Sequence, residues 1–173
     1  KGDVSFVKEG DVVLLSGGAR GITFEILKEL VREYKVRPVI LSRSPIDSVE
    51  QDFLKDGVDE KYVFDAVAKT MPTAKPLDIK KAAAKVMGQR EAVLNIRALE
   101  AMGVEVKYHA VDISDEHAVK KIVSGYDRID GVIHAAGLEI SQLIAKKDIG
   151  TFNAVFDTKV EGVKNLVSSL EGK

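Results

Sequence analysis

The chain has 173 residues, 45% of them hydrophobic, which is the size and composition of a single domain with a core of its own. Its 26 lysines and arginines are balanced by 27 aspartates and glutamates, so the net charge of -1 excludes a general attraction to nucleic acid or anionic lipid. The absence of cysteine excludes disulfides and thiolate zinc sites, and we predict no metal centre. We expect a cytoplasmic protein, because no apolar run could span a bilayer and residues 1–4 do not resemble a signal peptide.

Four short β-branched or leucine-rich runs alternate with segments of helical periodicity along the chain. They predict strands at residues 12–15, 39–41, 104–108 and 131–134. Strands separated by helices form parallel sheets that are covered on both faces. The pattern therefore predicts an α/β fold.

Helical periodicity follows the first strand and recurs in two later segments. The first helix ends near residue 35, and its predicted apolar stripe consists of Ile22, Ile26, Leu27, Leu30 and Val31. Residues 45–95 contain charges, turn signals and a helical stretch at 79–97, which predict an insertion of one or two helices rather than a second domain. A long amphipathic helix is predicted at residues 149–170.

A glycine-rich loop at residues 16–23 connects the first strand to the first helix. Glycines there let the backbone approach a pyrophosphate, and the free N–H groups at the start of the helix meet its negative charge. This context favours a Rossmann-type dinucleotide site formed by Ser16, Gly17, Gly18, Arg20, Gly21 and Ile22. A loop that serves packing alone is the alternative, because Gly17 and Gly18 are adjacent and Thr23 stands where many such loops have glycine.

The second strand ends in Ser42, Arg43 and Ser44. An arginine at this point accommodates the 2′-phosphate of NADP, whereas an acidic residue would hold the free ribose hydroxyl of NAD. Arg20 in the glycine loop adds a second cation for the same phosphate. We therefore predict NADPH as the cofactor, with two solvent-facing arginines as the alternative.

The third and fourth strands end in residues suited to the rest of a dinucleotide. Asp112 is placed to accept a hydrogen bond from the adenine amine, and Asp115 to cap the following helix. His134 is expected to be a packed structural residue rather than a general base. The cofactor residues predicted from these two strand ends are Asp112, Ile113, Ala135, Ala136 and Gly137.

Lys159 lies within the apolar stripe of the last predicted helix. An ammonium group among core positions must reach water, meet an anion or face a cavity, and a cleft beside a bound nicotinamide satisfies all three. The alternative is that the stem covers apolar surface while the charge stays in solvent. The stripe consists of Phe152, Val155, Phe156, Val163, Leu166, Val167 and Leu170.

Taken together, these motifs resemble the ketoreductase domains of polyketide synthases, a group within the short-chain dehydrogenase/reductase superfamily, and especially those of polyunsaturated fatty acid synthases. The likeness rests on residues 17–23, 41–44, 111–115, 131–137 and 159–162, whose order and spacing match nearly the whole chain. It implies a doubly wound Rossmann-type sheet. It also implies NADPH-dependent reduction of a β-ketoacyl chain on an acyl carrier protein, among the other domains of a synthase.

The same resemblance implies that Lys159 belongs to a catalytic set with a serine and a tyrosine. The tyrosine protonates the developing alkoxide, the serine holds the carbonyl oxygen, and the lysine lowers the pKa of the tyrosine. The serine and tyrosine motifs would follow Lys173, and the chain's 4 tyrosines lack the family's spacing to asparagine or lysine. We therefore expect an incomplete sheet, an inactive fragment, and self-association through an exposed sheet edge.

Two other functions are weighed against this one. A non-catalytic Rossmann subdomain that supports a neighbouring ketoreductase half would be expected to lose the glycine loop or Arg43, and both are present. A sugar-nucleotide epimerase or reductase would be expected to have a GxxGxxG loop and an acidic end to the second strand, and the sequence has neither.

Overall fold

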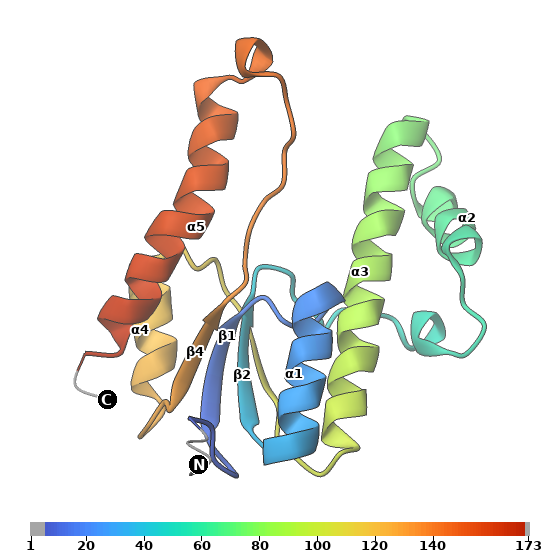
Figure 1. The fold of residues 1–173 in the computed structure, drawn as a ribbon. Coiled ribbons are helices and arrows are strands. Elements are labelled where there is room, and N and C mark those ends of the chain that lie inside the picture. Colours follow the sequence, from blue (N-terminus) through green and yellow to red (C-terminus); the bar gives the residue numbers. More distant parts are fainter. Residues whose placement is uncertain (1–5, 172–173) are drawn as a thin grey trace.

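The computed structural model describes residues 6–171, which form a four-stranded parallel sheet with helices on both faces (Figure 1). The strands lie in the order β3-β2-β1-β4, and this confirms the predicted fold class. The elements in chain order are β1 (Val12–Ser16), α1 (Gly21–Tyr34), β2 (Arg37–Ser42), the 3-10 helix η1 (Gln51–Leu54), α2 (Glu60–Thr70), α3 (Pro76–Glu100), β3 (Lys107–Ala110), α4 (Glu116–Ser124), β4 (Gly131–His134), the 3-10 helix η2 (Ile144–Lys146) and α5 (Ile149–Ser169).

The strand register brings all four carboxyl ends to one edge of the sheet. Ser16 at the end of β1 pairs with Leu41 of β2 on one side and with His134 of β4 on the other. The third strand differs from its prediction. Val104 and Val106 are buried beside α1 and α3, but pairing with β2 begins only at Lys107. Burial of these valines therefore produced a strand-like pattern ahead of the strand itself.

The central strand β1 is buried at all of its five positions because helices cover both faces of the sheet. Val13 and Leu15 pack in the cluster that includes α1 and α3. Val12 and Leu14 pack in the cluster that includes α4 and Leu166 of α5. Alternate side chains of one strand thus belong to two separate cores.

The buried face of α1 differs from the predicted stripe. Phe24, Leu27 and Val31 are buried, whereas the side chains of Ile22 and Ile26 are 83% and 49% exposed. The face that meets the sheet is rotated toward Phe24, so Ile22 and Ile26 lie on the other side of the helix. Prediction of Ile22 and Ile26 as core residues was therefore wrong in the described structure.

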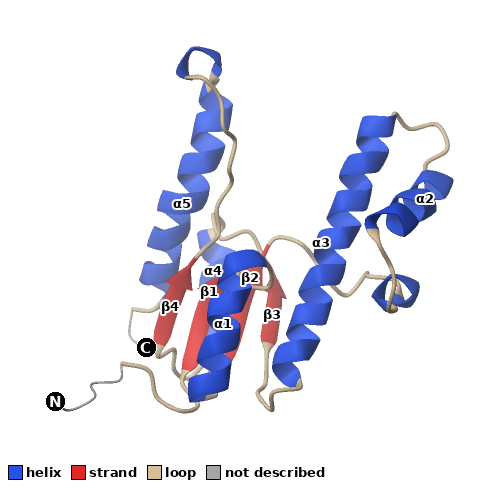
Figure 2. Ribbon diagram, turned by 45° about the vertical axis from the view of Figure 1, so that its right-hand side comes forward, coloured by secondary structure: helices blue, strands red, loops and turns tan. Residues whose placement is uncertain are grey.

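Helices α3 and α5 extend past the carboxyl edge of the sheet on either side of it (Figures 1 and 2). The 21 residues of α5 span roughly 30 Å, whereas the 4 residues of β4 span roughly 13 Å. Leu166 is therefore buried on the sheet, while Phe152 and Phe156 stack on each other beyond it and stay exposed. None of the helices in the described range is long and apolar enough to cross a bilayer.

The helical insertion expected after the second strand consists of η1, α2 and the first part of α3. Helix α2 packs its Val63 and Val67 against Ala83 of α3, which forms a small core of its own. Arg90 of α3 donates hydrogen bonds to the carbonyl oxygens of Phe53, at 2.7 Å, and Lys55, at 3.1 Å. These contacts hold the insertion against α3 (Figure 1).

Candidate functional site

A cavity of about 510 Å³ lies at the carboxyl edge of the sheet. Its walls come from the loop after β1, the ends of β2, β3 and β4, one face of α3, and Thr158 of α5. Its volume lies within the range of small-molecule and cofactor sites. In open parallel sheets, ligands bind in this position, because the loops that connect strands to helices meet there.

The glycine loop after β1 follows a backbone path that other residues would strain. Gly17, Gly18 and Gly21 have φ values of 79°, 104° and 61°. A Cβ at Gly17 would lie 3.4 Å from the backbone N of Ala136, and a Cβ at Gly18 would lie 3.3 Å from Cδ2 of Leu15. The loop therefore lies close against the end of β4, and its bare backbone could hold a pyrophosphate.

The start of α1 opens beside this loop. Arg20, the residue before the helix, makes no side-chain capping hydrogen bond. The Gly21 N–H contacts Oε1 of Glu91, at the long distance of 3.4 Å. Helix-start N–H groups are favourable partners for an anion because the positive end of the helix dipole adds to their own charge.

Cations outnumber acids around the cavity. Among the described lining residues, Arg20, Arg43 and Lys85 carry positive charge, and Asp112 carries the one negative charge. Hydrogen bonds from the hydroxyl and backbone N–H of Ser114 hold the pKa of Asp112 below its ordinary value. Asp112 is therefore an ionised acceptor at neutral pH, and the remaining charge of the cavity favours a ligand with several phosphates.

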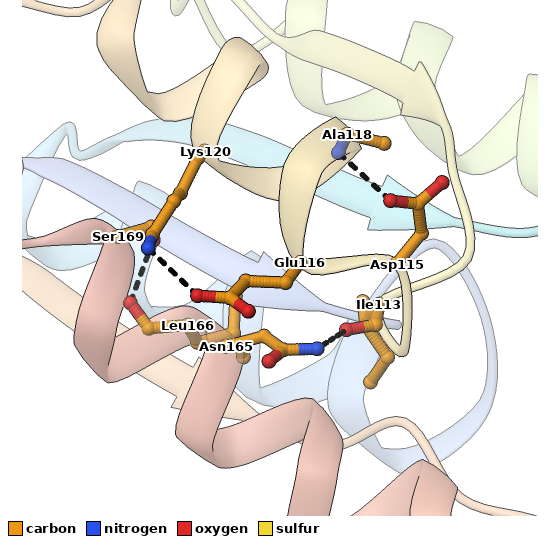
Figure 3. A network of polar contacts seen from close by, with 8 residues as sticks. All are labelled: Ile113, Asp115, Glu116, Ala118, Lys120, Asn165, Leu166 and Ser169. Atoms are coloured by element: carbon orange, nitrogen blue, oxygen red, sulfur yellow. Dashed lines mark hydrogen bonds and ion pairs between the residues drawn. The ribbon is translucent and has the colours of Figure 1, made fainter.

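Asp115 caps the start of α4, as the sequence predicts. Oδ1 of Asp115 accepts a hydrogen bond of 3.0 Å from the backbone N–H of Ala118, which caps α4 (Figure 3). In the same view, Nδ2 of Asn165 donates to the carbonyl oxygen of Ile113 at 2.9 Å. This buried bond joins α5 to the loop after β3, so Ile113 is held at the cavity wall from the α5 side.

A chain of hydrogen bonds runs from the end of β1 to α5 through His134. The Ser16 hydroxyl accepts from the N–H groups of Ala135 and Ala136, each at 3.2 Å, and lies 2.6 Å from Nδ1 of His134. On the other side of the ring, Nε2 lies 3.0 Å from the Lys159 carbonyl oxygen. A carbonyl only accepts, so Nε2 carries the proton and Nδ1 accepts from Ser16. His134 is thus a neutral bridge, which agrees with its expected structural role.

This bridge predicts a pH-dependent stability. Burial lowers the pKa of His134 from its ordinary value of 6.5, and this outweighs the hydrogen bond to the Lys159 carbonyl, which acts in the opposite direction. The unfolded chain therefore binds the proton more readily than the folded one. We expect the free energy of unfolding in urea to fall as the pH is lowered from about 7.5 to about 5.5.

The His134→Gln variant should lose part of that fall when its urea transitions are compared with those of the native chain at the two pH values. Burial also lowers the pKa of His109, which contributes in the same direction. His117, exposed on α4, provides the matched control in His117→Gln. Equal pH dependence of the native chain and the His134 variant would contradict the neutral bridge.

Lys159 itself is exposed, but its side chain reaches the end of β4. A Cβ placed on Gly137 would lie 2.8 Å from Nζ of Lys159. Thr158, the preceding residue, lines the cavity. The ammonium group therefore lies beside the cavity rather than inside a core, because this half of α5 extends beyond the sheet.

Most of the residues predicted to bind the cofactor come together around this cavity. Three do not line it: Ser16 is buried beneath the loop, and Gly21 and Ile22 lie in the exposed first turn of α1. Those that line the cavity are Gly17, Gly18, Arg20, Ser42, Arg43, Ser44, Asp112, Ile113, Ala135, Ala136 and Gly137.

Sequence reasoning missed the contribution of α3. Ala84, Gly88 and Ala92 line the cavity at intervals of four residues, and a stripe of small residues at helical spacing is the signal that could have revealed this face. Nε2 of Gln89 donates to the Pro45 carbonyl at 2.5 Å, and Nδ2 of Asn95 donates to the Ala19 carbonyl at 2.9 Å. Helix α3 thus supports both the loop after β2 and the glycine loop.

Tyr108 of β3 is a second residue that sequence reasoning missed. Its hydroxyl donates a hydrogen bond of 2.6 Å to the Ser44 carbonyl, which holds the loop that contains Arg43. Burial raises the pKa of Tyr108, so its hydroxyl stays protonated and can keep donating. No sequence signal separates this tyrosine from an ordinary strand residue.

Comparison with known proteins gives one consistent result. The family model for the KR domain matches residues 11–173. A polyunsaturated fatty acid synthase polypeptide of Thraustochytrium sp. is 31% identical over 180 aligned residues, which cover 95% of this chain and 6% of that protein. The polyketide synthase PksM of Bacillus subtilis is 26% identical over 164 residues, which cover 92% of this chain and 3% of that protein. The chain thus spans a small part of these relatives.

Solved structures agree on the fold. A ketoreductase domain from the bacillaene assembly line superposes with a TM-score of 0.67 at 21% identity, covering 97% of this chain and 31% of that one. Two dehydrogenases and a reductase with TM-scores of 0.61 were solved in complex with NAD or with NADPH. Similarity of fold therefore does not distinguish NAD from NADPH, and the preference must be argued from the residues of this chain.

Proposed function

Because the chain belongs to the KR domain family, we propose that it is the NADPH-binding part of a ketoreductase in a polyketide or polyunsaturated fatty acid synthase. The proposed reaction reduces a β-ketoacyl group, held as a thioester on an acyl carrier protein, to the β-hydroxyacyl group. Bound NADPH supplies the hydride. The acyl carrier protein and the other domains of the synthase are the proposed partners.

The observation that carries the choice of NADPH is the pair of arginines at the cavity. Arg20 and Arg43 come from two different loops and line the same cavity, and the end of β2 has serines beside Arg43 instead of an acidic residue. A guanidinium binds a phosphate through two parallel hydrogen bonds, and the hydroxyl groups of Ser42 and Ser44 can add to them. A carboxylate in this position would repel a 2′-phosphate.

Other residues of the chain would bind the remaining parts of NADPH and the reacting carbonyl. The glycine loop and the start of α1 bind the pyrophosphate, and Asp112 accepts from the adenine amine. The small residues after β4 leave room for a flat ring at the cavity floor. Lys159, beside Gly137, holds positive charge next to the reacting carbonyl and lowers the pKa of the tyrosine that protonates it.

That tyrosine is not supplied by the described part of this chain. Tyr108 is bound to the loop after β2, and Tyr126 lies beside His109 on the outer side of β3. Tyr34 at the end of α1 and Tyr62 on α2 lie on other elements. The 173 residues by themselves are therefore expected to bind the cofactor without reducing a ketone.

A fluorescence titration of the 173-residue chain with NADPH and with NADH tests the proposal. The expected result is binding of NADPH with a lower Kd than NADH. In the synthase that carries this chain, a β-ketoacyl thioester should then be reduced as NADPH is consumed. Absence of binding by either nucleotide would favour the non-catalytic subdomain instead.

A further inference from the structure

Gly88 lies in the middle of α3, at a position where glycine is unfavourable. It is buried, and it stands thirteenth of the 25 residues of the helix. Glycine in a helix interior is less stable than alanine because it gives up more backbone freedom on folding. Its backbone is helical and has no positive φ, so the conformation of the chain does not require glycine here.

Space for a side chain explains the glycine. A Cβ placed on Gly88 would overlap Nη1 of Arg20, and its next nearest neighbour would be Cζ of the same guanidinium. The end of the Arg20 side chain therefore occupies the notch that the absent Cβ leaves in α3. Both residues line the cavity.

The notch is held at a defined place relative to the cavity. Asn95, two turns further along α3, donates to the carbonyl oxygen of Ala19, next to Arg20 in the chain. Gln89, adjacent to Gly88, donates to the carbonyl oxygen of Pro45. Two hydrogen bonds thus fix α3 against both loops that bring arginines to the cavity, so the notch stays at a fixed distance from the backbone that carries Arg20.

We propose that Gly88 determines nucleotide specificity by seating the Arg20 guanidinium where it meets the 2′-phosphate of NADPH. This inference rests on the proposed function, since it concerns how the same site distinguishes NADPH from NADH. Gly88 is a positioning residue: it contributes no atom to the ligand and acts through Arg20. Helix α3 thereby becomes part of the proposed cofactor site.

The Gly88→Ala variant tests this in the 173-residue chain. Arg20 must leave the notch, and the Kd for NADPH should rise about tenfold, less than for complete loss of a charge-assisted contact, because the displaced guanidinium keeps its charge near the phosphate. The Kd for NADH should change less than about twofold, because NADH has no 2′-phosphate. The pair 2′,5′-ADP and 5′-AMP, which differ in the same phosphate, should repeat this difference in calorimetry.

Two controls separate the notch from general damage. Ala98→Ser changes an exposed position of α3 that does not line the cavity and should leave both Kd values unchanged. In an Arg20→Ala background no guanidinium fills the notch, so adding Gly88→Ala should have no further effect on NADPH binding. The midpoint of thermal unfolding of Gly88→Ala should equal or exceed that of the native chain, since alanine is the better helix former.

Either of two results would overturn the inference. One is an equal loss of NADPH and NADH affinity in Gly88→Ala, and the other is a loss that persists without Arg20. Failure of the proposed function would appear differently, as a native chain with no preference for NADPH. A Gly88→Ala chain that does not fold would contradict the expected midpoint of thermal unfolding and would also overturn the inference, because the notch would then serve packing.

Discussion

Replacing Arg43 with alanine should remove most of the chain's preference for NADPH over NADH. The guanidinium stands at the end of β2, and its side chain is exposed toward the cavity that it lines. One charge-assisted hydrogen bond to phosphate contributes roughly 2 kcal/mol, so the Kd for NADPH should rise about 30-fold or more. Fluorescence titration of both nucleotides with native and variant chains measures the change.

The matched control removes the same charge at a position that does not line the cavity. Arg97 lies exposed in the last turn of α3, and Arg97→Ala should leave both Kd values unchanged. Raising the salt concentration should weaken NADPH binding by the native chain more than by Arg43→Ala. Ions screen the contact between Arg43 and the 2′-phosphate, which the variant lacks. An Arg43→Ala chain that keeps its preference for NADPH would reject this residue as the 2′-phosphate ligand.

Replacing Lys159 with alanine should have the largest effect on the reaction. In the synthase that carries this chain, ketone reduction should fall at least about a hundredfold, because the proton donor loses the charge that keeps its pKa low. NADPH binding by the 173-residue chain should change far less, since the Lys159 ammonium lies beside Gly137 and not at the arginine end of the cavity. Steady-state rates with a β-ketoacyl thioester, together with nucleotide titrations, separate the two effects.

Lys164 provides the control on the same helix. Its Nζ forms an exposed ion pair with Glu161, and Lys164→Ala should leave the reduction rate unchanged. If Lys159→Ala lowered the rate only as much as Lys164→Ala, Lys159 would have the surface role that its exposure also allows. A parallel loss of NADPH binding would instead make it a cofactor ligand.

The strand β1, which is buried on both faces, shows why the fold could be predicted from the sequence. Strand and helix periodicity are local properties, and parallel strands place their carboxyl ends at one edge wherever the chain goes next. The glycine loop, Arg43 and Asp112 each begin within two residues of the end of a strand, so their meeting around one cavity needed no knowledge of distant contacts. Capping of α4 by Asp115 was equally local.

The roles of residues that act through packing could be recognised only in the structure. The predicted stripes of α1 and α5 differ from the buried faces because apolar periodicity does not decide which side of a helix packs on the sheet. Ile22 and Val167 are exposed, whereas Phe24 and Leu166 are buried. The His134 bridge joins β1, β4 and α5 through atoms that no spacing brings together.

The sequence by itself therefore determined the fold class, the glycine-rich loop after the first strand and the place of the arginine that follows the second strand, because each depends on neighbours along the chain. Tertiary structure alone decided that α3 closes the site and that Gly88 makes room for Arg20. These two residues are 68 positions apart, and a side chain's need for space becomes visible only when the two segments have packed together.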